Sequence, residues 1–62
     1  MFGVFIKDKT VYIREVEGAV HDRDFQATAR AEQSLFVTWS DKLTTAQGVQ
    51  QRLATARGFE AL

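Results

Sequence analysis

A two-residue alternation of apolar and polar side chains is the feature that most limits what this chain can fold into. Between Phe25 and Trp39, every odd-numbered position is apolar except Gln33, and every even-numbered position is polar except Phe36. Successive side chains of a β-strand point to opposite faces of the sheet, so this alternation predicts strands with one buried and one solvated face. The N-terminal third of the chain has the same alternation, which predicts one sheet built from both segments.

The N-terminal segment is expected to form a β-hairpin. Residues 4–7 and 10–14 are rich in β-branched and aromatic side chains, and Asp8 and Lys9 between them fit a two-residue turn. This turn length places the aliphatic residues of both strands on one face and the aromatic residues on the other. The predicted cross-strand pairs are Ile6/Val11, Val4/Ile13, Phe5/Tyr12 and Gly3/Arg14.

Residues 25–36 are compatible with two structures. The segment is rich in good helix formers, above all alanines. On a helix, however, Glu32 would interrupt the apolar stripe and Val37 would point away from it. Two strands joined by a turn at residues 32–34 place Ala29 and Val37 on the same face and account for more of the pattern. We therefore expect strands here, with a helix as the alternative.

The last segment is predicted to be a helix. Four apolar residues recur at spacings of three and four, which is the spacing of one helix face. They are Ala46, Val49, Leu53 and Ala56. Ser40 and Thr44 are the candidate N-caps, and Gly58 stands where a residue in the left-handed conformation would end the helix.

These elements predict a single α+β domain over residues 1–62, namely a four-stranded antiparallel meander followed by one C-terminal helix. The alternative is a β-hairpin followed by two helices. The C-terminal helix is expected to pack on the aliphatic face of the sheet, with Trp39 and Leu53 as large core residues. The sheet residues of the predicted core are Val4, Ile6, Val11, Ile13, Phe25, Ala27, Ala29, Leu35, Val37 and Trp39.

The composition argues against catalysis and against a bound metal or cofactor. The chain has no Cys and one His, and the segment His21–Asp24 contains a cation, Arg23, and too few ligands for a zinc site. This segment is expected to be a solvated turn. No nucleophile motif surrounds a serine, and the glycines do not form a phosphate-binding loop. We expect a protein that is not an enzyme and that has no metal site and no cofactor.

The size of the chain predicts self-association. A domain of 62 residues buries only about 60% of the surface that its unfolded chain exposes, and this one has no disulfide to compensate. We therefore expect a homodimer or a higher homo-oligomer. No apolar run approaches the ~20 residues that a membrane span needs, and the start of the chain has no apolar segment typical of a signal peptide. A cytoplasmic protein that does not bind membranes is expected.

The candidate binding site is the polar face of the predicted sheet, where Glu32 is the only acidic residue expected. This face would combine three aromatic rings with three cations: Phe5, Lys7, Tyr12, Arg14, Arg30 and Phe36. Aromatic residues and Arg are enriched in protein interfaces, and the same groups can stack on bases and neutralise phosphates. The eight Lys and Arg residues are balanced by eight Asp and Glu residues, so the basic excess typical of nucleic-acid-binding proteins is missing. We expect a small accessory or regulatory module that binds a protein partner, with single-stranded nucleic acid as the alternative ligand.

Overall fold

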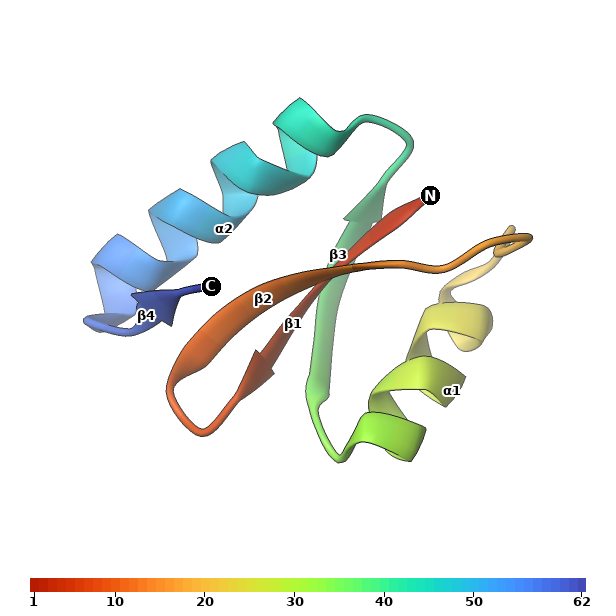
Figure 1. Ribbon diagram of the computed structural model, residues 1–62, viewed down its shortest axis with the longest axis horizontal. Helices are drawn as coiled ribbons and strands as arrows, with labels where there is room; N and C mark the ends of the chain where they lie inside the picture. Colours follow the sequence, from red (N-terminus) through yellow and green to blue (C-terminus); the bar gives the residue numbers. More distant parts are fainter.

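The computed structural model describes all 62 residues as a small α+β fold, in which the strands lie between two helices (Figure 1). Its elements are β1 (Phe2–Lys7), β2 (Thr10–Glu15), α1 (Asp22–Glu32), β3 (Leu35–Ser40), α2 (Leu43–Arg57) and β4 (Glu60–Ala61). The strand order is β3-β1-β2-β4; β1 is antiparallel to both of its neighbours, and β4 is parallel to β2. The predicted α+β class is confirmed. The antiparallel meander with one helix is wrong, and the alternative of a hairpin followed by two helices fits.

The N-terminal hairpin forms as predicted. All four predicted cross-strand pairs are present in the register of β1 and β2. Asp8 and Lys9 form the turn, with positive φ angles of 51° and 66°. Positive φ at both central residues is the requirement of a type I′ turn, whose twist matches that of the flanking strands.

Residues 22–32 form a helix, so the prediction of strands in this segment is wrong. Phe25 and Ala29 are its buried residues. Because they are four residues apart, they fall on one face of either a strand or a helix, and the alternation cannot distinguish the two. The Asp24 carboxylate accepts hydrogen bonds from the N–H groups of Val20 (3.0 Å) and His21 (3.2 Å). The segment His21–Asp24 is therefore the start of α1 and not a turn between strands.

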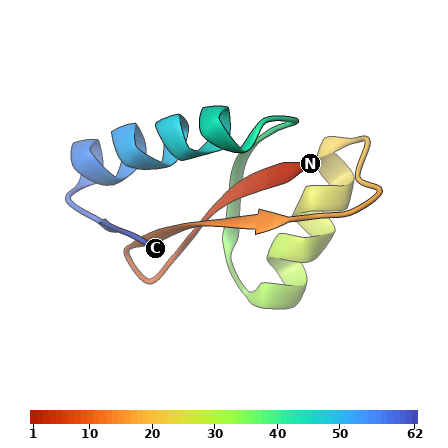
Figure 2. The same cartoon turned by 45° about the horizontal axis from the view of Figure 1, so that its top comes forward.

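The two helices cover opposite faces of the sheet (Figure 2). On one face, Phe25 of α1 packs in a cluster with Phe5 and Tyr12. On the other face, alanines of α2 pack against Val4 and Val11, as predicted for the aliphatic face. Neighbouring residues of a strand point to opposite faces, so β1 and β2 contribute to both clusters.

The predicted core is right at Val4 and Val11, whereas Ile6 and Ile13 are half-buried. Trp39 is also half-buried and packs on the aromatic face, not on the predicted aliphatic face. Val4 and Val11 are fully buried, whereas Leu35 and Val37 of β3 are 64% and 38% exposed. Ala27 lies on the exposed side of α1. Leu35 and Val37 are exposed because β3 is the outermost strand and α2 lies mainly over β1 and β2.

The C-terminal helix is confirmed, and Gly58, with a φ of 69°, ends it as predicted. Its N-terminus differs from the prediction, because Lys42 is the N-cap residue and Thr44 lies inside the helix. Ser40 is nevertheless close to the predicted role, since its hydroxyl accepts a hydrogen bond from the N–H of Lys42 at 3.1 Å. Ala56 is exposed instead of buried.

Gln50 occupies a position in the buried stripe of α2 that the sequence analysis did not identify. It is only 4% exposed. Its side-chain Nε2 donates hydrogen bonds to the carbonyl oxygens of Val11 (2.9 Å) and Leu62 (2.8 Å). Both hydrogens of this buried amide are hydrogen-bonded, so no unpaired donor is left in the core. The two bonds hold the C-terminal residues against β2.

Gly3 permits the closest packing between α1 and the sheet. A Cβ atom at this position would lie 2.7 Å from the ring of Phe5 and 2.8 Å from the ring of Phe25. Both rings are fully buried, and protein interiors are closely packed. The absence of a side chain at Gly3 therefore allows the Phe25 ring to reach β1.

We predict that Gly3→Ala lowers the free energy of unfolding by about 1–3 kcal/mol, the usual cost of overpacking a core. Gly48→Ala is the matched control, because nothing lies within 4 Å of a Cβ there and the position is in the interior of α2. That change should raise the free energy of unfolding by up to about 1 kcal/mol through helix propensity. Urea denaturation of both variants measures the two effects, and equal stability of Gly3→Ala and the parent protein would contradict this account of the packing.

Candidate binding site

The structure does not gather the six predicted binding residues on one accessible face. Phe5 and Tyr12 are buried and Phe36 is half-buried, because α1 covers the sheet face that carries them. Lys7, beside the hairpin turn, and Arg14, near the far end of β2, both reach Glu32 from opposite sides, while Arg30 lies beside β3. The expectation of an open aromatic face is therefore wrong.

The aromatic rings pack against one another between α1 and the sheet. The ring centroids of Phe5 and Tyr12 are 5.4 Å apart, and those of Phe5 and Phe36 are 5.8 Å apart. The ring of Phe25 stacks on Phe36 at 5.5 Å and on Trp39 at 5.6 Å. These separations are typical of aromatic pairs that stabilise a core. The rings are thus engaged with each other.

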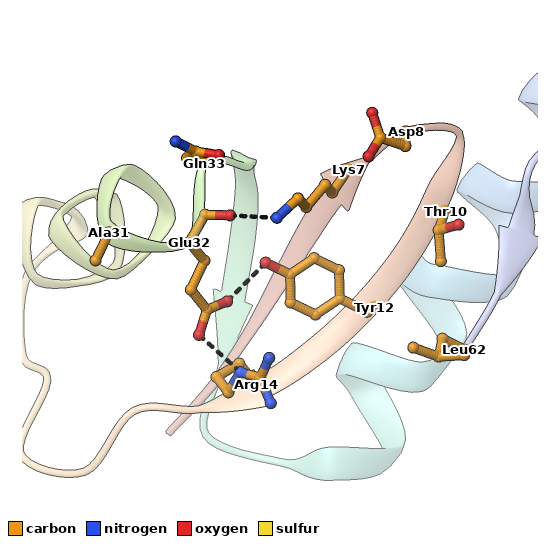
Figure 3. Close-up of a pocket in the computed structure, with 9 residues that line it drawn as sticks. All are labelled: Lys7, Asp8, Thr10, Tyr12, Arg14, Ala31, Glu32, Gln33 and Leu62. Carbon is orange, nitrogen blue, oxygen red and sulfur yellow. Dashed lines mark hydrogen bonds and ion pairs between the residues drawn. The ribbon is translucent and has the colours of Figure 1, made fainter.

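Lys7 and Arg14 surround Glu32 at the C-terminal end of α1 (Figure 3). Tyr12 Oη donates a hydrogen bond to Glu32 Oε1 (2.7 Å), and Arg14 Nε donates one to Oε2 (2.9 Å). Lys7 Nζ donates to the main-chain oxygen of Glu32 at 2.9 Å. We call these four residues the Glu32 cluster. They line an open hollow of about 540 Å³ and join the end of α1 to β1 and β2.

The electrostatics of the Glu32 cluster favour an ionised carboxylate. The hydrogen bond from Tyr12 and the Arg14 guanidinium lower the pKa of Glu32, although partial burial acts in the opposite direction. Burial raises the pKa of Tyr12, so its hydroxyl remains protonated and continues to donate. The Arg14 guanidinium also lies 5.3 Å from the centre of the Tyr12 ring. Because Tyr12 and Arg14 already donate hydrogen bonds to this carboxylate, the Glu32 cluster is best described as a contact that holds α1 against the sheet.

A second candidate surface is the outer edge of β3. This strand is the last in the sheet, and its outer backbone N–H and C=O groups have no neighbouring strand. Its six residues, Leu35–Ser40, include no charged residue and no proline. Val4 pairs with Thr38 and Phe5 with Phe36, so Val37 is the extra residue of a β-bulge. Charges, prolines and β-bulges are common protections of an edge strand, and β3 carries only the bulge at Val37.

A shallow hollow of about 360 Å³ lies beside this edge, between α1 and β3. It is lined by Gln26, Ala29, Arg30, Ser34, Leu35 and Phe36. The exposed side chains of Leu35 and Val37 flank the edge itself. The sequence analysis placed these two residues in the core. The sequence signal at these two residues is that residues 35–40 carry no charge. A strand of this kind is fully buried only when another strand pairs with each of its two edges.

The opposite edge of the sheet is better protected. The short strand β4 pairs with Thr10 and Val11 of β2. The rest of β2 ends in Arg14 and Glu15, which are exposed charged residues. Charged side chains discourage the addition of another strand. β3 is thus the edge that is open to a further polypeptide.

Comparison with protein-family models, curated protein sequences and solved structures gave no match. No helix has both the length and the apolar character to cross a membrane. No group of three or more His, Asp and Glu side chains is placed to hold a metal ion.

We predict that Glu32→Gln lowers the free energy of unfolding at neutral pH by up to about 1 kcal/mol, because the solvent-screened ion pair with Arg14 is lost. The folded-state pKa of Glu32 is lowered, so its contribution is present above the ordinary carboxyl pKa and is lost as the pH falls through the folded-state value. The difference between parent and variant should therefore shrink in acid. Urea denaturation across a pH series measures it. Glu17→Gln is the control, since Glu17 is exposed, and indistinguishable pH profiles for the two variants would refute this role of Glu32.

Proposed function

We propose that this protein is a small non-enzymatic module that binds another polypeptide by strand addition at the outer edge of β3. The observation that carries the proposal is the unpaired, uncharged edge with Leu35 and Val37 exposed along it. An extended polypeptide that pairs with such an edge gains main-chain hydrogen bonds along its length. The proposal keeps the protein-binding role expected from the sequence and moves it from the aromatic face to β3.

The hollow between α1 and β3 supports a degree of sequence specificity. In strand addition, the backbone supplies affinity and pockets for alternate side chains supply selectivity. Ala29 and Phe36 give the hollow apolar walls, and Gln26 and Arg30 give it a polar rim. A bound segment with apolar residues at every second position would place one side chain there. The preferred ligand is thus an extended segment with alternating apolar residues.

Single-stranded nucleic acid, the alternative ligand, has less support. Base stacking needs exposed rings, whereas Phe5 is buried and Tyr12 is hydrogen-bonded to Glu32. Arg14 and Lys7 are also engaged with Glu32. A cation already paired within the protein releases fewer counterions on binding phosphate, so its contribution to affinity is smaller.

A displayed library of short peptides tests the proposal. We predict that the selected peptides have apolar residues at alternate positions, slow the exchange of β3 amides, and bind Val37→Lys at least tenfold more weakly. Gln51→Lys, on the exposed side of α2, is the matched control and should bind like the parent protein. Peptides that bind Val37→Lys normally, or that perturb only the Glu32 cluster, would refute strand addition. A labelled oligonucleotide titrated at low salt tests the alternative, and tight salt-sensitive binding would favour it.

A further inference from the structure

We infer that the polypeptide that pairs with β3 is β3 of a second copy of this chain. The two strands would run antiparallel about a two-fold axis and join both sheets into one. This inference rests on the proposed function and names its partner. A symmetric dimer needs a surface that is complementary to itself, and three features of the β3 edge meet that requirement.

The first feature is the apolar character of the strand. Val37 is near the middle of β3, so a two-fold axis there brings the Val37 side chains of both copies together. Apolar pairs on adjacent strands stabilise a sheet, and Val37 is 38% exposed in the single chain. Each copy therefore covers the exposed side chain of the other. No charge within β3 opposes this contact.

The second feature is the position of α1. The backbone of this helix lies nearest to β3, while Phe25 and Glu32 reach from it to the inner strands. With a two-fold axis perpendicular to the sheet, both copies carry α1 on the same face of the joined sheet. The two α1 helices would therefore lie next to each other and run antiparallel. The positive N-terminal end of one helix then meets the negative C-terminal end of the other. The same two-fold dimer thus pairs the two β3 strands and brings the two α1 helices into contact.

The third feature is the distribution of charge along the edge. Arg30 lies beside the start of β3, where it lines the hollow with Ser34. Asp41 directly follows the end of the strand, and Asp22 accepts a hydrogen bond from Trp39 Nε1 at 2.8 Å near the same end. Antiparallel pairing places the start of one strand opposite the end of the other. That end also carries Lys42, the N-cap residue of α2, so the favourable contacts are those of Arg30 with Asp22 and Asp41 of the second copy. The two-fold axis repeats these contacts on both sides of the dimer.

The size of the chain is consistent with a contact of moderate affinity. A standard interface buries about 800 Å² of each partner, which is about a fifth of the 4239 Å² surface of this chain. We expect a contact limited to one strand edge and one side of α1 to bury less than that. Only 11 of the 62 residues are buried, so additional apolar burial would stabilise the fold. We expect a dissociation constant in the micromolar range.

Sedimentation equilibrium of the full chain tests the dimer. The parent protein should change from the 7.0 kDa mass of the chain to twice that mass as its concentration rises through the micromolar range. Val37→Lys should stay monomeric, because it places two like charges at the two-fold axis. Gln51→Lys should dimerise like the parent, and circular dichroism should show that both variants keep the fold.

A charge exchange tests the antiparallel arrangement. Arg30→Asp and Asp41→Arg should each weaken dimerisation several-fold at low salt, because each places like charges opposite one another. An equimolar mixture of the two variants should restore the dimer, since both contacts between unlike copies then join opposite charges. Failure of the mixture to associate more tightly than either variant alone would overturn the antiparallel inference.

The outcomes separate this inference from the proposed function. A monomer at all concentrations, together with peptide binding that depends on Val37, would overturn self-pairing and leave strand addition intact. A dimer that Val37→Lys does not affect would mean that another surface mediates association, which also overturns the inference. Absence of peptide binding to a monomeric sample of the protein would refute strand addition itself.

Discussion

The fold depends on the two buried faces of strand β1. Val4 and Phe5 are adjacent in the sequence, point to opposite faces, and are both fully buried. A strand that is buried on both faces needs a cover on each side of the sheet. α2 provides the cover for the aliphatic face and α1 for the aromatic face. A meander with one helix would leave the aromatic face open, which explains why residues 22–32 form a second helix.

α1 is fixed to the sheet at both of its ends. At its N-terminus, Asp22 accepts a hydrogen bond from Trp39, and at its C-terminus Glu32 accepts hydrogen bonds from Tyr12 and Arg14. Between these ends, Phe25 packs into the chain of aromatic rings. The helix is thereby held against β3, which has no strand on its outer side. The same contacts that complete the core therefore leave the edge as the proposed place for a second polypeptide.

Local features of the fold could be predicted from the sequence, and features that depend on strand order could not. The register of the hairpin followed from a two-residue turn, and Gly58 marked the end of α2. α1 was predicted only as the alternative to strands, because Phe25 and Ala29 have a spacing that fits both a strand and a helix. Of the candidate site, the sequence pattern put Lys7, Arg14 and Glu32 on one face, but with Glu32 in a turn between strands and not at the end of a helix. It could not indicate that β3 pairs with β1 on one side only, so the exposure of its apolar residues was missed.

The most direct test of the account is amide hydrogen exchange of the full chain at low and at high micromolar concentration. If β3 pairs with a second copy, the outward N–H groups of residues 35–40 should exchange more slowly at the higher concentration. The amides of α2 and of the β1–β2 hairpin should show a smaller change, because they are already protected within one chain. Exchange of β3 amides that is independent of concentration, in a sample that has doubled in mass, would contradict the account.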